Sequence, residues 1–246
     1  MTGHTVVSRQ DWLDARLAHL AKEKDLTRQR DALLQERIDL PWERVEKEYV
    51  FETVSGRQTL AELFGDKSQL LIYHFMFGPE WEQGCPSCSL GAETMNANLV
   101  HLTQRGVAFA AVSRAPLGKI EAFRKRMGWS FPWASAFGSD FNHDFAVSFT
   151  AEEMAKGRYY NFGTSGHPSE EAPGVSAFYK DENGEVFHTY SSYARGVEGL
   201  LGVYALLDVA PLGRDEAGLS YPMAWVRHHD RYETQAPKRA AECCSV

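Results

Sequence analysis

The chain has 246 residues, of which 43% are hydrophobic, 24% charged and 12% aromatic, values typical of a folded globular protein. Its 26 Lys and Arg against 33 Asp and Glu give a net charge of −7, which argues against a nucleic-acid-binding protein. No segment has the roughly 20 apolar residues that a membrane-spanning helix needs, and the first residues lack the apolar core of a signal peptide. We therefore expect neither nucleic-acid nor membrane partners.

The four cysteines form two local pairs, Cys85 with Cys88 and Cys243 with Cys244. A secreted disulfide scaffold would use its cysteines to join distant parts of the chain. Local pairs without an export signal favour a reducing compartment, so the sequence predicts a cytoplasmic protein. Cys243 and Cys244 are interpreted as part of a flexible tail, with electron transfer to the active site or capture of a soft metal as alternatives.

Residues 8–37 are rich in Leu, Ala, Arg, Glu and Lys and contain neither Gly nor Pro. Trp12, Leu17 and Leu20 fall at helical spacing, which predicts one long helix, with a break near Asp25 as the alternative. Two roles stay open for this helix: packing along the main body, or a homodimer contact.

Alternating elements follow from residue 70. The apolar run 70–77 predicts a strand that is covered on both faces, and an apolar stripe that includes Cys88 predicts a helix after it. Residues 107–112 predict a second buried strand, and a helix is expected over 116–127. Residues 129–174 are rich in aromatic side chains but weak in periodicity, which indicates an insertion.

A hairpin and a helix complete the pattern. Residues 175–179 and 185–190 predict two strands joined by a turn at Asn183-Gly184, and apolar residues over 197–207 predict a closing helix. The first strand–helix–strand unit is expected to be a right-handed parallel crossover, with the hairpin adding antiparallel strands. The fold class is therefore α/β, with a central mixed sheet flanked by helices.

This element order, with a Cys pair at the start of the helix after the first core strand, resembles that of the thioredoxin superfamily. Residues 75–89 (FMFGPEWEQGCPSCS) and 225–230 (WVRHHD) are similar to a bacterial thioredoxin-like family catalogued as domain of unknown function 899. The resemblance covers about residues 5–232. It implies a thioredoxin-like fold, and it supplies no assigned reaction.

The resemblance and the composition together suggest three parts. Residues 1–47 form an N-terminal helical extension, and residues 48–232 form a thioredoxin-like domain with its aromatic-rich insertion at about 129–174. Residues 233–246 are small and polar and are expected to form a flexible C-terminal tail.

The spacing of Cys85 and Cys88 places both sulfurs on one side of the first turn of a helix. Unpaired N–H groups and the helix dipole there would lower the pKa of Cys85 below the roughly 8.5 of a free thiol. Cys85 is then the expected nucleophile in attack on a disulfide, and Cys88 the resolving thiol. Pro86 suits the first helical position, and Trp81 would form one wall of the site.

Further site residues follow from the resemblance alone. Pro173 occupies the place of the superfamily's cis-proline opposite the Cys pair, and with Gly174 it would shape a substrate groove; an ordinary trans proline is the alternative. The expected partners are a disulfide-containing protein or small molecule and an upstream reductant. We expect no bound cofactor.

Several alternatives stay open. The same fold could serve as a non-catalytic binding module with a metal on the Cys pair, but a metal site needs two further ligands and no histidine is spaced for this, so no metal is assigned. His143 is the histidine to inspect first near Cys85. A peroxiredoxin-like peroxidase is the other alternative, although Gly78 and Glu82 stand where that family's pattern places Pro and Thr or Ser.

Carboxylates near the site would have the opposite effect on the thiol. Glu80, Glu82, Asp140 and Asp144 are expected near its mouth, where they would raise the pKa of Cys85 and reduce its reactivity.

Overall fold

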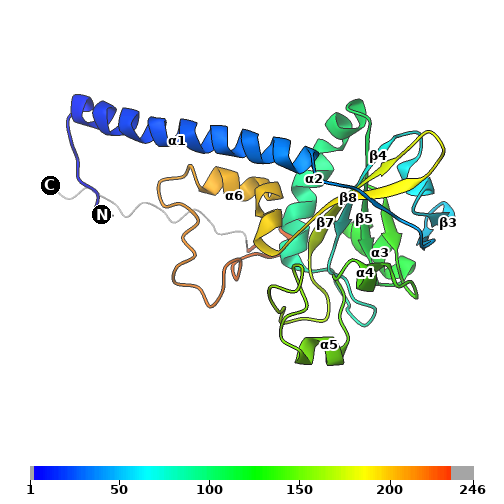
Figure 1. Cartoon of the computed structure of the whole chain (residues 1–246). Coiled ribbons are helices and arrows are strands. Elements are labelled where there is room, and N and C mark those ends of the chain that lie inside the picture. The colour runs from blue at the N-terminus through cyan, green and yellow to red at the C-terminus, as the bar shows by residue number, and fades with distance from the viewer. Residues whose placement is uncertain (1–2, 234–246) are drawn as a thin grey trace. The chain divides into compact units, whose positions relative to one another are not determined.

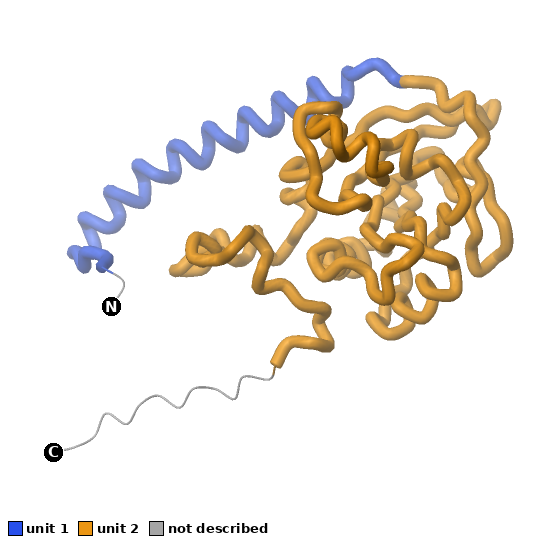
Figure 2. The backbone as a smooth tube through the Cα atoms, turned by 90° about the horizontal axis from the view of Figure 1, so that it is seen from below, with its two compact units in different colours: residues 1–42 blue, residues 43–246 orange. Residues whose placement is uncertain are grey.

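A computed structural model describes residues 3–233 (Figure 1). It contains two compact units, residues 1–42 and 43–246, which Figure 2 shows in different colours. The first unit holds one helix, α1 (Arg9–Ile38), which buries none of its residues. Ser8 caps it, because its side chain accepts a hydrogen bond from the Asp11 backbone N–H at 3.1 Å. The predicted long helix is thus confirmed, and it runs unbroken through Asp25.

Within residues 43–233 the second unit forms an 8-stranded sheet in the order β1-β8-β7-β4-β5-β6-β2-β3. The strands are β1 (Glu43–Arg44), β2 (Val50–Thr53), β3 (Gly56–Thr59), β4 (Gln69–His74), β5 (Val107–Ser113), β6 (Trp133–Ser135), β7 (Gly174–Lys180) and β8 (Val186–Tyr193). The α-helices are α2 (Pro86–Gln104), α3 (Leu117–Arg126), α4 (Phe141–Asp144), α5 (Ala151–Ala155) and α6 (Gly202–Leu207). Short 3-10 turns are η1 (Glu62–Phe64), η2 (Ala194–Leu200) and η3 (His229–Arg231).

The central four strands have the predicted topology. β4 pairs with β5 in parallel through the α2 crossover, and it pairs with β7 antiparallel on its other side. β8 returns antiparallel to β7. The order β8-β7-β4-β5, with a helix after each of the two parallel strands, is the thioredoxin arrangement, so the predicted fold is confirmed.

Strand β4 contributes side chains to both faces of the sheet. Tyr73 packs in a cluster with Cys88 on the side of α2 and α3, whereas Ile72 packs with Phe141 and Phe178 on the opposite side. Successive residues of a strand point to opposite faces, so an unbroken apolar run is what a strand buried on both sides requires.

The segment predicted as an insertion, residues 129–174, contains one strand of the sheet. Trp133–Ser135 forms β6, which pairs in parallel with β5 and lies inside the sheet. All three residues are buried, so the segment lacks the polar–apolar alternation that identifies a strand in a sequence.

The closing helix also differs from the prediction. The segment 197–207 divides into η2 and α6, with Leu201 at φ −90° and ψ 86° between them. Gly199 and Gly202 lie in this segment, and glycine disfavours a continuous helix. Among the described residues no helix has both the length and the apolar character needed to cross a bilayer.

Candidate active site

Cys85 and Cys88 lie at the N-terminus of α2, at the carboxyl end of β4. After β4 the chain continues beside β5, and it returns so that the Cys85 N–H donates to the Met76 carbonyl at 3.0 Å. Cys85 is the N-cap of α2 and Pro86 its first residue, as the sequence predicts. Cys85 is half-buried and Cys88 is buried, and both are free thiols.

The pKa of Cys85 is lowered to about 7 by hydrogen bonds to its sulfur. The largest effect comes from the Cys88 thiol, which donates to it; burial opposes this, and the backbone N–H groups of Cys88 and Ser87 add to the lowering. A pKa near 7 leaves about half of the Cys85 side chains as thiolate at neutral pH.

Cys88 is affected in the opposite direction. Burial raises its pKa well above the ordinary value, and the hydrogen bond with Cys85 and the charge on Cys85 raise it further. The Met76 N–H and the Tyr73 hydroxyl, which lie within hydrogen-bonding reach of the Cys88 sulfur, oppose this effect. The pair therefore consists of one accessible thiolate and one buried thiol, which is the asymmetry that a nucleophile and a resolving thiol need.

The acidic residues do not surround the thiols as expected. The Glu82 side chain is 87% exposed and lies 3.5 Å from the Lys119 ammonium. Asp140 and Asp144 both bind Lys47, at 2.9 and 2.6 Å. These carboxylates are thus directed to lysines, and the groups that set the pKa of Cys85 are the hydrogen-bond donors at the helix start.

A loop over residues 78–84 covers the site beside Cys85. The indole of Trp81 packs over Gly78, where an added Cβ would lie 3.0 Å from the ring nitrogen. Lys119 of α3 fixes the loop, since its ammonium donates to the carbonyl oxygens of Pro79 and Trp81, each at 3.1 Å. Trp81 also packs against the cluster that contains Cys88, and its role as a wall toward substrate stays a prediction.

The C-terminal segment Val226–Asp230, here called the clasp, holds the residue before Cys85. His228 is buried, and its Nε2–H donates to the Gly84 carbonyl at 2.8 Å. Its Nδ1 accepts from Arg126 at 3.3 Å, and Arg126 in turn forms two hydrogen bonds with Asp230, at 2.8 and 2.7 Å. Burial lowers the pKa of His228, which favours the neutral ring that this bonding pattern requires.

One more contact joins the clasp to α2, and Arg126, which binds the clasp, also contacts the loop before Cys85. His229 Nδ1 lies 2.6 Å from the Glu93 carboxylate of α2, and Arg126 donates to the Gln83 side chain at 2.8 Å. Sequence reasoning marked the WVRHHD motif as characteristic but did not place it beside the cysteines, because a contact across 144 residues leaves no periodic signal.

Of the two alternatives for Pro173, the structure has the trans form, because the described residues contain no cis peptide bond. The trans form is the lower-energy state of an X-Pro bond, and the flanking chain fits it, with the Pro173 carbonyl accepting from the Tyr160 hydroxyl. Gly174 begins β7 opposite His74. An added Cβ there would lie 2.6 Å from the Tyr193 ring, so close packing explains this glycine.

His143 contacts Arg114, at 3.1 Å, and not the thiols. Arg114 lies 3.5 Å from Glu171, a buried carboxyl that accepts from Ser148 and whose pKa burial raises to about 7. No group of three or more His, Cys, Asp or Glu side chains in residues 3–233 is arranged to hold a metal ion. Cys243 and Cys244 lie outside the described residues.

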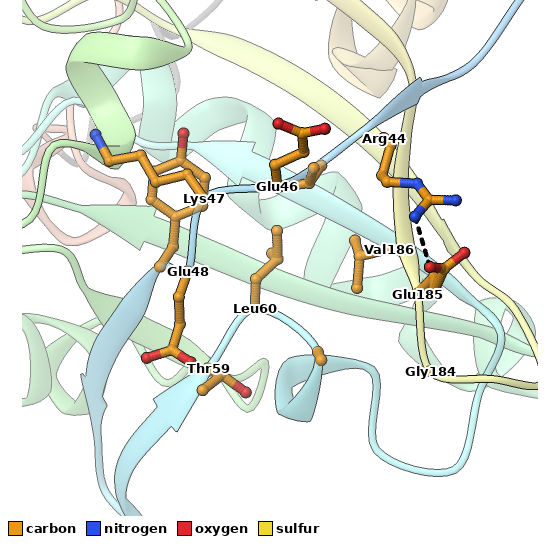
Figure 3. Close-up of a pocket in the computed structure, with 12 residues that line it drawn as sticks. Arg44, Glu46, Lys47, Glu48, Thr59, Leu60, Gly184, Glu185 and Val186 are labelled. Atoms are coloured by element: carbon orange, nitrogen blue, oxygen red, sulfur yellow. Dashed lines mark hydrogen bonds and ion pairs between the residues drawn. The ribbon is translucent and has the colours of Figure 1, made fainter.

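A pocket of about 290 Å³ lies elsewhere, lined by residues 44–49 before β2, by residues 59–61 at the end of β3 and by residues 184–186 at the turn that joins β7 to β8 (Figure 3). Its charged residues include Arg44 and Glu185, which pair with each other at 2.7 Å. None of the predicted site residues lines it. The candidate active site is therefore taken to be the Cys85–Cys88 pair at the start of α2, where a thiol has a lowered pKa.

Comparisons with known proteins place the chain as follows. Searching the curated proteins returns no match. Among solved structures, one of peroxiredoxin Q from Xanthomonas campestris has 16% sequence identity and a TM-score of 0.46, covering 69% of this chain and 96% of that one. Peroxidoxin BcpB from Mycobacterium tuberculosis has 13% identity and a TM-score of 0.45, covering 65% and 93%. The model of one family, described as bacterial protein of unknown function (DUF899), matches residues 1–232. The chain belongs to this family.

Proposed function

We propose that this protein is a thiol–disulfide oxidoreductase in which Cys85 is the nucleophile and Cys88 the resolving thiol. The observation that supports it best is the position of Cys85, a half-buried N-cap of α2 with a pKa lowered to about 7, next to a buried thiol that donates to it. Hydrogen-bond donors around one sulfur make it a thiolate at neutral pH, and the thiolate is the reactive form.

The reaction has two steps. The Cys85 thiolate attacks a substrate disulfide R–S–S–R′, forms a mixed disulfide with R, and releases R′–S⁻. Cys88 then attacks the Cys85 sulfur, the bond between Cys85 and R breaks, and R–SH leaves with the proton from Cys88. The product is a Cys85–Cys88 disulfide, which an upstream dithiol reductant must return to the thiol form. A reducing compartment such as the cytoplasm supplies such a reductant.

This chemistry needs no bound cofactor. Trp81 precedes the nucleophile in the loop over residues 78–84 and is half-buried, and Pro86 follows it as the first residue of α2. We assign them to the surface that contacts the substrate. Pro173 and Gly174 at the start of β7 complete the proposed set.

The test is a pH profile of Cys85 alkylation by iodoacetamide, together with exchange on a disulfide substrate such as oxidised glutathione. Wild-type protein should show an inflection near pH 7. Cys85→Ser should lose exchange, and Cys88→Ser should accumulate a mixed disulfide with glutathione that mass spectrometry detects. Exchange at the wild-type rate by Cys85→Ser would contradict the proposal.

Two other outcomes would favour the alternatives. Stoichiometric metal in protein purified without a nickel column would favour a metal-binding module. Conversion of Cys85 to sulfenic acid by hydrogen peroxide within seconds would favour a peroxidase. We expect neither, and the residue three positions before Cys85, where a hydroxyl would assist peroxide, is the exposed carboxylate Glu82.

A further inference from the structure

The Tyr73 hydroxyl contacts Cys88. Tyr73 is buried in β4, and its hydroxyl donates to the Cys88 carbonyl oxygen at 3.2 Å. The same hydroxyl is within hydrogen-bonding reach of the Cys88 sulfur. Its ring packs edge-on against Phe75 with 6.0 Å between centroids, which fixes the direction of the hydroxyl.

Gly91 in α2 makes room for this hydroxyl. A Cβ added at Gly91 would lie 2.9 Å from the Tyr73 oxygen and 3.1 Å from a methyl group of Leu201. A glycine inside a helix is less favourable than alanine by up to about 1 kcal/mol. Helix α2 thus has a residue that disfavours helix formation at the position where the tyrosine oxygen approaches.

We propose that Tyr73 is a catalytic residue of the resolving step: its hydroxyl donates a hydrogen bond to the Cys88 sulfur as that sulfur becomes a thiolate and attacks Cys85. This inference rests on the proposed dithiol exchange and assigns to that reaction a residue that is not part of the Cys pair.

The need for such a donor follows from what changes when a mixed disulfide forms. In the free enzyme the hydrogen bond to Cys85 and the negative charge on Cys85 both raise the pKa of Cys88. Once Cys85 is bonded to substrate, its charge is gone and these two effects disappear. Burial then remains as the effect that disfavours the Cys88 thiolate, opposed by the Tyr73 hydroxyl and the Met76 N–H.

Tyr73 acts as a donor and not as a base. Burial raises its own pKa well above the ordinary value, so the hydroxyl keeps its proton at neutral pH. In the step itself the Cys88 S–H proton is lost and is taken up by the departing R–S⁻. The Cys88–Cys85 bond forms as the Cys85–R bond breaks, and Tyr73 returns unchanged.

Ellman's reagent, an aromatic disulfide that releases a coloured thiolate, separates the two steps. Attack by Cys85 releases the first thiolate, and attack by Cys88 on the mixed disulfide releases the second. Tyr73→Phe, which keeps the ring and removes the hydroxyl, should slow the second release about tenfold and leave the first within about twofold. The pH profile of the second release should also move to higher pH.

Tyr193→Phe is the matched control, because the Tyr193 hydroxyl is bonded to the Phe145 carbonyl at 2.9 Å and not to either cysteine. It should leave both releases at the wild-type rate. A second variant, Gly91→Ala, displaces the Tyr73 hydroxyl without removing it and should slow the second release as well. It serves as the test if Tyr73→Phe does not fold.

An unchanged second release in a folded Tyr73→Phe protein, or equal slowing in Tyr193→Phe, would overturn the inference while leaving the dithiol mechanism intact. Absence of a second release in the wild type would instead overturn the proposed function itself.

Discussion

The two faces of strand β4 provide a controlled comparison. Tyr73 points toward α2 and the cysteines, whereas its neighbour His74 points to the other side of the sheet, where it packs against the rings of both Phe141 and Phe145. Both side chains are buried, and burial favours the neutral form of each: it raises the pKa of Tyr73 and lowers that of His74 to about 3.

The hydrogen bonds of His74 lead to other polar side chains of the sheet and to no thiol. His74 Nε2 bonds to Ser176 Oγ at 2.8 Å, Ser176 bonds to Ser191 at 2.8 Å, and Ser191 bonds to His188 at 2.7 Å. These side chains bond to one another, so they stabilise the sheet interior. On the other side of the sheet, by contrast, backbone N–H groups at the start of α2 remain available to the Cys85 sulfur. Burial alone therefore does not create a reactive site; at Cys85 the Cys88 thiol, together with the N–H groups at the start of α2, stabilises the thiolate.

On the cysteine side of β4, we expect the largest change in stability from Gly84→Ala. A Cβ there would lie 2.5 Å from Phe75 and 2.9 Å from Phe123, so the loop before Cys85 must move. We expect the free energy of unfolding to fall by about 3 kcal/mol and the pKa of Cys85 to rise. Urea unfolding and the alkylation profile measure both.

Gly118→Ala is the matched control, because an added Cβ at Gly118 meets no atom within 4 Å. Gly118 lies inside α3, where alanine is the better helix former. The free energy of unfolding of the variant should therefore be unchanged or slightly higher. Equal losses in the two variants would contradict the tight packing at Gly84.

On the His74 side of β4, the prediction concerns how the stability of the protein depends on pH. Unfolded chains protonate histidine near pH 6.5, but folded His74 resists protonation down to about pH 3. The unfolded state therefore binds more protons, and the stability present above pH 6.5 is lost as the pH falls. We expect a loss of about 2 kcal/mol between pH 7 and pH 5 from this residue.

His74→Leu should remove that part of the pH dependence, since Ser176 keeps Ser191 as its partner. His101→Leu, at an exposed position of α2, should keep the wild-type slope. Urea titrations at the two pH values measure the slopes, and identical slopes in His74→Leu and wild type would refute the assignment.

The clasp gives a smaller, more local effect. His228→Ala leaves the Gly84 carbonyl without its donor, which costs about 1–3 kcal/mol for a buried acceptor. The pKa of Cys85 should rise, because the peptide before it is no longer fixed. His228→Gln, which restores an N–H donor, should recover part of both changes. A Cys85 alkylation profile that is the same in all three proteins would show that the clasp acts on stability alone.

The smallest effect concerns the covering loop. Glu82→Gln should leave the pKa of Cys85 unchanged, because this carboxylate is 87% exposed.

Lys119→Met removes the donor to two carbonyl oxygens of the loop over residues 78–84. The loop should then be held less firmly, and the alkylation rate of Cys85 should increase. A large shift in Glu82→Gln would restore the view that nearby carboxylates control the thiol.

The elements that could be predicted from the sequence are those with a local residue pattern. The apolar run in β4, the Asn183-Gly184 turn and the Cys-Pro-Ser-Cys helix start each have a short-range physical signature, and all three are present. Strand β6 was missed because it is short and buried on every side, and the closing helix was overextended because glycines inside it were disregarded.

The surroundings of the cysteines were harder to predict. Their spacing identified the helix start, but Tyr73, Arg126 and His228 reach the site through tertiary contacts that no pattern encodes. Gly91 was the available signal: a glycine inside an otherwise regular helix indicates close approach by another group. For Pro173 the cis form was suggested only by the resemblance to the thioredoxin superfamily, and no local residue pattern supported it.

The bond between His228 and Gly84 joins residues 144 positions apart, and this has a consequence during synthesis. A ribosome makes the chain from the N-terminus, so Cys85 and its helix leave the exit tunnel well before the clasp exists. Until then the Gly84 carbonyl has water as its partner, and the loop has its full freedom. In a nascent chain the donors at the start of α2 are thus expected to act on the thiol first, and the contact that fixes the peptide before Cys85 forms only as the last part of the described sequence folds back.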